Sequence, residues 1–470
     1  MKNKNILGFI TGTLLFIITA ILVIFLKKLN ILPDKYFIFV TVGLFFITIV
    51  IDIFLFIKKK GGIFSFFKVL AYIAAIILFV VYSYGIHYLN KTMNFFGNMG
   101  LIKEEITSYY VIVLKDSKYE EISDLYGQTL TYSENIEEEV LSKIKLNLKY
   151  STVKTIDSLK ERLYTSKTES ILVSDVIKED LEEKYSDFSS KTRILTTIDI
   201  TKGVEDITKK VSIKNTPFNV LISGIDTYGS INKTSRNDVN IIVSINPNTN
   251  KVLLTSIPRD YYVQLHGKSG YKDKLTHAGI YGINVAVQTI EDLLDIDINY
   301  YVKVNFTTVV DLVDKIGPIS VYSDQNLNLW GCKFIKGYNS VDGDCALAFA
   351  RERHSYVDGD RHRGRNQQEV IRAIFNKVTS GTTLISEYTE ILDSLDGKFA
   401  TNMDMDEVMS FVKYELDDLR KYNILDTQLD GVGSMELTYS YPHQKLYVMI
   451  PDEESISDAK EYINKILSEN

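Results

Sequence analysis

Residues 218–260 read FNVLISGIDTYGSINKTSRNDVNIIVSINPNTNKVLLTSIPRD, and this stretch decides the fold. It contains three apolar, β-branched runs of the kind that form buried strands, namely Phe218–Gly224, Val239–Ile245 and Lys251–Ile257. The turn residues NPNTN at 246–250 separate the last two runs and predict a hairpin. A sheet is therefore expected to begin near Thr216.

The pattern changes after this stretch to helices that alternate with strands. Helical periodicity is present at Ile283–Leu294, Thr307–Ile316, Asp344–Ala350 and Gln367–Val378, and strands are expected at Tyr300–Asn305 and Ile319–Tyr322. From about Thr383 the chain predicts further helices and one strand, Leu446–Ile450. We therefore expect residues 211–470 to form an α/β domain with a central mixed sheet flanked by helices and a helical C-terminal extension.

A smaller α/β unit is expected before it, over residues 91–210, following a short linker at Asn90–Glu105. Its predicted strands and helices are Val111–Leu114, Ile136–Leu146, Thr129–Tyr132, Ile156–Leu163 and Ser170–Val173. The sequence of this unit contains no cluster of residues with a catalytic pattern. Its clustered Lys and Glu residues predict a solvated surface.

Residues 1–90 are overwhelmingly apolar and contain three candidate membrane spans, Ile6–Leu26, Tyr36–Ile57 and Phe64–His87. Each has about the 20 residues that a helix needs to cross a bilayer. A cleaved signal peptide is the weaker reading of the first span, because no small-x-small cleavage site follows it. The lysines in short loops favour a cytoplasmic N-terminus, with Lys2, Lys4, Lys58, Lys59 and Lys60 inside and Lys27, Lys28 and Lys35 outside. Three spans then place the rest of the chain outside the cell membrane.

Net charge and cysteine content indicate which ligands are excluded and whether a disulfide can form. The formal net charge of −7 over 470 residues argues against general nucleic-acid binding, which needs a basic surface. The only two cysteines, Cys332 and Cys345, both fall in the part expected outside the membrane. A disulfide between them would stabilise the fold by about 3 kcal/mol; the alternative is two thiols in a reducing habitat.

Charged residues stand at the ends of the predicted strands. Asp226 follows the first strand, Arg236 and Asp238 precede the second, and Arg259 and Asp260 follow the third. Ligands of such sheets bind at strand ends and in the loops that follow them. The two carboxylates Asp226 and Asp238 could hold a hard divalent cation such as Mg²⁺; surface ion pairs are the alternative.

A second charged cluster lies further along the chain. Residues 350–368 read ARERHSYVDGDRHRGRNQQ and contain Arg351, Arg353, Arg361, Arg363 and Arg365 on a protein that is acidic overall. Guanidinium groups suit bidentate contacts with phosphate, and the run ends where a helix is expected to start. A solvated basic loop or contact with anionic lipid head groups is the alternative. No P-loop and no kinase motif is present, so the two clusters together predict a site for a pyrophosphate with one metal ion.

These motifs resemble those of the LytR-CpsA-Psr family. The resemblance rests on FNVLISGID (218–226), RND (236–238), SIPRD (256–260), KLTHA (274–278) and FARER (349–353) with DRHRGRNQ (360–367), and it covers about 216–380. Three spans plus an accessory domain look like the capsule-associated branch of that family. Phe349 stands where the family often has a tyrosine, and Asn366 stands where many relatives have arginine, which puts a role for Arg365 in doubt.

The resemblance implies transfer of an undecaprenyl-pyrophosphate-linked glycopolymer, such as capsule or teichoic acid, onto peptidoglycan, with Mg²⁺ or Mn²⁺ as cofactor. By motif, Asp226 and Asp238 would hold the metal, and Asp360 would orient an arginine. The pyrophosphate would be held by Arg236, Arg259, Lys274, Arg351, Arg353, Arg363 and Gln367. Asp238 and Asp260 are the two candidates for the general base.

The resemblance also predicts an apolar tunnel for the prenyl chain, lined by residues that follow Thr276 and by the helices Ile283–Leu294 and Thr307–Ile316; a plain hydrophobic core is the alternative. Two other functions stay open. A hydrolase could cleave the same pyrophosphate, and a regulator or lipid-binding scaffold would need no catalysis. Direct DNA binding is disfavoured, because no helix-turn-helix with a basic recognition helix is present.

Overall fold

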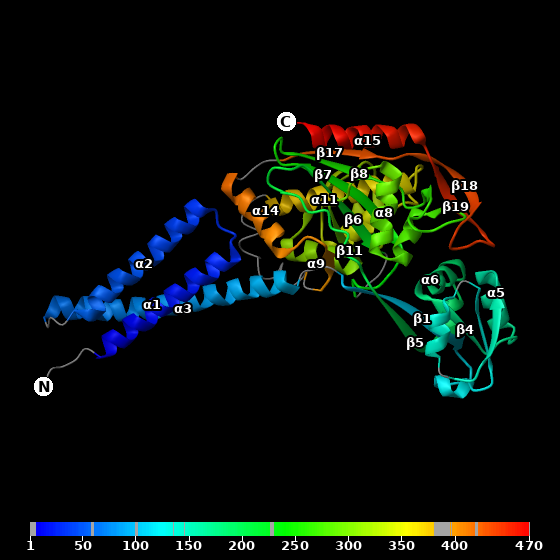
Figure 1. Cartoon of the computed structure of the whole chain (residues 1–470), viewed down its shortest axis with the longest axis horizontal. Helices are drawn as coiled ribbons and strands as arrows, with labels where there is room; N and C mark the ends of the chain where they lie inside the picture. Colours follow the sequence, from blue (N-terminus) through cyan, green and yellow to red (C-terminus); the bar gives the residue numbers. More distant parts are fainter. Residues whose placement is uncertain are drawn as a thin grey trace.

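The computed structural model describes residues 6–57, 61–98, 102–134, 136–144, 146–225, 230–379, 395, 397–418 and 422–469. Figure 1 shows three parts: long helices at the N-terminal end, a small accessory domain, and a larger α/β domain between them. This arrangement confirms the predicted fold class.

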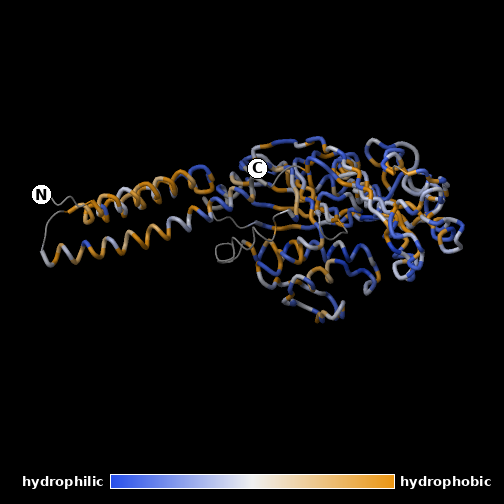
Figure 2. Tube along the Cα trace, turned by 90° about the horizontal axis from the view of Figure 1, so that it is seen from below, coloured by the Kyte–Doolittle hydropathy of each residue, from blue (hydrophilic) through white to orange (hydrophobic). Residues whose placement is uncertain are grey.

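The N-terminal part consists of three long apolar helices, α1 (Ile6–Leu29), α2 (Asp34–Phe56) and α3 (Gly62–Asn98). All three are long and apolar enough to cross a membrane. Many of their large apolar side chains are exposed, which suits lipid and not water. Figure 2 shows the hydrophobic residues along these helices in orange. The predicted linker is wrong, because α3 continues to Asn98 and the next strand already begins at Glu104.

The turn between α1 and α2 contacts the large domain through helix α14 (Met405–Asp418). The Lys413 ammonium lies 2.8 Å from an Asp34 carboxylate oxygen and 3.2 Å from the Asn30 side-chain oxygen. The end of α1 and the start of α2 are therefore on the same side as the globular domains, while the end of α2 and the start of α3 lie at the far end (Figure 1). The residues expected inside, Lys2, Lys4 and Lys58 to Lys60, lie outside the described part of the chain.

The accessory domain is a five-stranded sheet with the strand order β3-β2-β4-β1-β5. Its strands are β1 (Glu104–Leu114), β2 (Thr129–Ser133), β3 (Lys149–Val153), β4 (Ser170–Ser174) and β5 (Thr192–Gly203). Its α-helices are α4 (Glu138–Lys143), α5 (Ile156–Tyr164), α6 (Asp175–Lys184) and α7 (Phe188–Lys191). Alternate residues of β1 belong to two different hydrophobic clusters, so both faces of this sheet are covered.

The central sheet of the large domain has six strands in the order β16-β11-β6-β7-β8-β17. Their bounds are β6 (Phe218–Ile225), β7 (Asn237–Asn246), β8 (Lys251–Ser256), β11 (Tyr300–Asn305), β16 (Phe399–Thr401) and β17 (Asn423–Gln428). The predicted hairpin is present between β7 and β8, whereas β11 runs parallel to β6 and β17 runs parallel to β8. The sheet is therefore mixed, as predicted.

Helices cover both faces of this sheet. On one face α8 (Ile283–Leu294) and α15 (Glu453–Ser468) pack against Leu221, Ile242 and Leu253. On the other face Ile241 and Leu254 pack against Ile371 of α11 (Asp360–Thr379). Helices α9 (Phe306–Ile316) and α10 (Gly343–Arg351) share a second cluster with α11. Successive side chains of a strand point to opposite faces of the sheet. A strand that is covered on both faces is therefore apolar at most of its positions.

A disulfide joins Cys332 of β14 (Cys332–Phe334) to Cys345 near the start of α10. β14 pairs with β13 (Leu327–Leu329), and the hairpin turn between them carries Trp330. The same large domain contains β9 (Tyr262–Val263), β10 (Asp273–Lys274), β12 (Ile319–Ser323) and β15 (Gly337–Val341). The disulfide thus fixes this hairpin to the helix that ends at Arg351.

The prediction of a helical C-terminal extension with a single strand is wrong. Besides α14 and α15 this part contains β16, β17, β18 (Gly431–Leu437) and β19 (Lys445–Pro451), and two of these strands belong to the central sheet. β17 reads NILDTQ and none of its residues is fully buried, so it lacks the apolar run by which buried strands are recognised. Thr383, where the extension was expected to begin, lies outside the described residues.

Candidate active site

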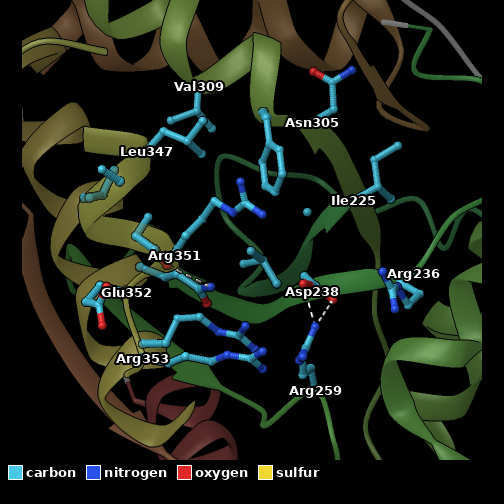
Figure 3. Close-up of a pocket in the computed structure, with 18 of the residues that line it drawn as sticks. Ile225, Arg236, Asp238, Arg259, Asn305, Val309, Leu347, Arg351, Glu352 and Arg353 are labelled. Carbon is cyan, nitrogen blue, oxygen red and sulfur yellow. Dashed lines mark hydrogen bonds and ion pairs between the residues drawn. The ribbon is translucent and has the colours of Figure 1, made fainter. Parts of the chain in front are cut away.

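A cavity of about 540 Å³ lies where β6 and β11 end and β7 begins, at one end of the central strands (Figure 3). Arg236 and Asp238 stand at the start of β7, and Arg259 follows the end of β8. Because β7 and β8 run antiparallel, the start of one lies beside the end of the other, and these side chains meet there. Asp226, which follows β6, lies outside the described residues, so the predicted pair of metal ligands is placed for Asp238 only.

The core of the site is an ion pair between Asp238 and Arg259. One terminal nitrogen of Arg259 lies 2.8 and 2.7 Å from the two carboxylate oxygens, and the Thr276 hydroxyl donates to the same carboxylate at 3.1 Å. Burial by itself would raise the pKa of Asp238, but the charges of Arg259, Arg363 and Arg236 outweigh it and hold that pKa far below its usual range. Asp238 is therefore a carboxylate at all physiological pH values and a weak proton acceptor.

Two further acids lie close to this pair. A carboxylate oxygen of Asp260 lies 3.0 Å from the Lys274 ammonium, and burial, which would raise the pKa of Asp260, is outweighed mainly by Lys274, so that this pKa is lowered. Asp360 contacts Arg363; burial raises the pKa of Asp360, and nearby carboxylates add to the rise. Of the three acids, Asp360 is therefore the one most easily protonated.

The structure brings most of the predicted phosphate-binding residues to one cavity. Its lining includes Arg236, Arg259, Arg351, Arg353, Arg363 and Gln367. Lys274 does not line the cavity but pairs with Asp260. Arg365 does not line the cavity and contacts Asp358.

Three of these arginines, Arg351, Arg353 and Arg363, come from the end of α10, the loop after it and the start of α11. Arg351 ends α10, and its guanidinium lies 4.3 Å from the Phe306 ring centroid and 5.1 Å from that of Trp330. Helix α11 begins at Asp360, seven residues before the start predicted from the sequence, so Arg363 already lies in its first turn. The first turns of α11 contain charged and polar residues and lack a helical apolar period. The helix start predicted from that period was therefore too late.

The other half of the cavity is apolar. It is lined by Ile222, Val239, Val304, Phe306, Val309 and Leu347. Of the two helices expected to line a tunnel, α9 contributes Val309, whereas α8 packs into the hydrophobic core through residues such as Ala286 and Ile290. A guanidinium-rich end thus continues directly into an apolar end, the arrangement expected for a ligand with a charged head and an apolar chain.

The accessory domain supplies site residues that sequence reasoning missed. Glu179, Glu182 and Glu183 of α6 line the cavity, and Asp180 contacts Arg236. The prediction that the charged residues of this domain form only a solvated surface is therefore wrong for α6. The run EDLEE at 179–183 is visible in the sequence, but an acidic chain has many such runs, and only the packing of the two domains selects this one.

Comparison with known proteins identifies the family. The sequence profile described as the LytR_cpsA_psr family matches residues 185–458, more than half of the chain. The chain belongs to this family. The predicted family and the predicted enzyme class, a transferase, are thereby confirmed.

Similar members of the LytR_cpsA_psr family carry a functional name. A Bacillus cereus protein named polyisoprenyl-teichoic acid–peptidoglycan teichoic acid transferase TagU is 34% identical over 233 residues, which are 49% of this chain and 74% of that protein. An Enterococcus faecalis protein of the same name is 35% identical over 229 residues, 48% and 74% of the two chains. The crystal structure of B. subtilis TagU is 31% identical with a TM-score of 0.42, and the match covers 55% of this chain and 99% of that one.

Of the two predicted metal ligands, the described residues place Asp238 in the cavity. No group of three or more His, Cys, Asp or Glu side chains suited to a metal lies within the described ranges. Mg²⁺ often uses only one or two carboxylates and completes its shell with water and phosphate oxygens. One carboxylate oxygen of Asp238 accepts from both Arg259 and Thr276, whereas the other accepts from Arg259 and keeps a lone pair for a cation. The donor set fits a metal that binds together with a phosphate ligand.

Proposed function

We propose that the protein transfers a polyprenyl-pyrophosphate-linked glycopolymer, such as capsule or teichoic acid, onto cell-wall peptidoglycan. The observation that carries this proposal is the single cavity in which five arginines adjoin an apolar wall. The names of the TagU relatives support both the lipid-linked donor and the peptidoglycan acceptor.

The apolar wall would hold the prenyl chain near Phe306 and Val309, and the guanidinium groups of Arg259 and Arg363 would hold the diphosphate. A peptidoglycan hydroxyl attacks the phosphorus that carries the glycan. A new oxygen–phosphorus bond forms, the bond to the bridging oxygen breaks, and polyprenyl phosphate leaves with the electron pair. The arginines stabilise the charge that moves onto this leaving group.

Charge neutralisation and positioning supply most of the catalysis in such a transfer, since the phosphoryl group needs little covalent help. Mg²⁺ or Mn²⁺, when held by Asp238 and Asp226, would add charge neutralisation at the phosphate oxygens. The proton of the attacking hydroxyl passes to water or to a carboxylate. Asp238 and Asp260 have lowered pKa values and accept it poorly, whereas the raised pKa of Asp360 makes that residue the better acceptor.

An assay with and without the acceptor separates the transferase from a hydrolase. We expect the purified full-length protein to attach glycan from a lipid-linked donor to added peptidoglycan, and to release little free glycan when peptidoglycan is omitted. The products are measured as glycan bound to sedimented peptidoglycan and as polyprenyl phosphate. Equal turnover with and without peptidoglycan, with all glycan free in solution, would favour the hydrolase.

We also propose that the protein is a multi-pass cell-membrane protein whose accessory and large domains face outward. The three apolar helices and the mild lysine bias support this orientation. An alkaline phosphatase fused after Asn470 is expected to be active, because that enzyme needs an oxidising compartment to form its disulfides. An inactive phosphatase together with an active cytoplasmic reporter at the same position would favour a regulatory protein instead.

A further inference from the structure

The carboxylates of accessory helix α6 contact two arginines of the cavity, Arg236 and Arg353. We propose that Glu179, Asp180 and Glu183 act as internal competitors of the substrate's diphosphate, so that α6 must release these arginines when the lipid-linked substrate binds. The inference rests on the proposed function, because it assigns to these arginines the diphosphate of that same substrate.

The geometry at Arg236 is that of a bound anion. One terminal nitrogen of Arg236 lies 2.8 Å from a carboxylate oxygen of Asp180, and the other lies 3.2 Å from one of Glu179. The two nitrogens thus receive two oxygens, as they would from one phosphate group. The Arg236 side chain is only 12% exposed in this state, so little of the guanidinium is left for a second anion.

A second arginine is held more loosely by the same helix. A terminal nitrogen of Arg353 lies 3.7 Å from a carboxylate oxygen of Glu183, and another Glu183 oxygen lies 4.0 Å from Arg236. Glu183 therefore stands between two arginines that reach the cavity from different segments, β7 and the loop after α10. A diphosphate between the same two arginines would meet this negative charge at short range, and like charges repel.

Helix α6 is also bound to the large domain by a hydrogen bond outside the cavity. The hydroxyl of the buried Tyr441, which belongs to the large domain, donates to Asp180 in the middle of α6. The accessory domain is joined to the rest of the chain through β1 and β5, which pair along their whole length (Figure 1). Loss of the α6 contacts would therefore leave the central sheet and the other arginines of the cavity in place.

Removing the competing carboxylates should make diphosphate bind more tightly. We expect the double variant Glu179→Gln, Glu183→Gln of the full-length protein in detergent to bind inorganic pyrophosphate about tenfold more tightly than the wild type, as measured by isothermal titration calorimetry. The matched control is Glu138→Gln, Glu139→Gln, which removes the same charge from exposed positions of the same domain and should change the dissociation constant less than twofold. Tyr441→Phe removes the hydroxyl that binds Asp180 of α6 and leaves every arginine in place. It should also lower the dissociation constant for pyrophosphate, because α6 is then held less firmly against Arg236.

The arms of this experiment separate the inference from the proposed function. Unchanged or weaker binding by both the Gln double variant and Tyr441→Phe would overturn the inference and show that α6 positions the arginines instead. If Arg259→Ala binds pyrophosphate as well as the wild type does, the cavity is not a diphosphate site, and the proposed function fails with it. Loss of binding in Arg259→Ala with no gain in the α6 variants would leave the proposed function standing alone.

Discussion

Transfer of glycopolymer to peptidoglycan is expected to fall at least about a hundredfold in the Arg259→Ala variant, the loss typical of removing one charge-stabilising donor from an active site. Arg259 is the partner of Asp238, with both carboxylate oxygens within 2.8 Å of one guanidinium nitrogen, and its side chain is 14% exposed. Its Nε lies 3.8 Å from a carboxylate oxygen of Asp260 and 4.0 Å from one of Asp360, so its charge acts on all three acids of the site. The rate is measured as glycan bound to peptidoglycan at saturating donor.

The matched control is Arg372→Ala, which removes an arginine of α11 that pairs with Asp426 away from the cavity. This variant should keep the wild-type rate within about twofold, as surface changes generally do. The thermal midpoint of Arg259→Ala must also be measured, because the change leaves Asp238 buried with fewer cations around it. A folded Arg259→Ala protein that transfers glycan at the wild-type rate would favour a lipid-binding scaffold and contradict the proposed enzyme.

The largest effect on stability is expected from Glu105→Ala. Glu105 is the second residue of the accessory strand β1 and accepts a hydrogen bond of 2.8 Å from the Lys303 ammonium in the interior of the large domain, where Lys303 is only 2% exposed. It also accepts the backbone N–H of Ile283 at the start of α8, at 3.1 Å. Removing this carboxylate leaves a buried ammonium without its counter-ion, which costs about 3–5 kcal/mol. Urea denaturation followed by circular dichroism measures the free energy of unfolding.

Two variants control for this result. Glu104→Ala changes the exposed neighbour in the same strand and should alter the free energy of unfolding by less than about 0.5 kcal/mol. Glu105→Gln combined with Lys303→Met removes both charges and should restore most of the lost stability. A Glu105→Ala protein as stable as Glu104→Ala would show that Lys303 finds another partner and that the pair does not anchor the accessory domain.

Local patterns in the sequence were enough to predict the apolar helices and most elements of the central sheet. The three apolar spans, the strands β6 to β8 and the helices α8 and α9 each have a hydrophobic period that depends only on residues close in the chain, and the structure contains all of them. The failures fall where that period is weak. The edge strand β17 is half exposed, and the first turn of α11 is full of charged residues, so neither has the apolar signal that marks a buried element.

The motif resemblance likewise selected the arginines of the cavity, because Arg236, Arg259, Arg351, Arg353 and Arg363 all line it. It could not assign their partners. Lys274 was expected at the pyrophosphate but pairs with Asp260, and Arg236 pairs with acids 56 and 57 residues away in another domain.

The three long apolar helices, the mixed α/β sheet and the family all follow from the amino-acid sequence, since each depends on local periodicity or on short ordered motifs. The pairing of each carboxylate with its arginine, and the contribution of the accessory domain to the cavity wall, became evident from the three-dimensional structure. The physical reason is that an ion pair depends on distances of a few ångströms between side chains on separately folded units. Those distances are set by how the domains pack, for which no period or spacing in the chain is a guide.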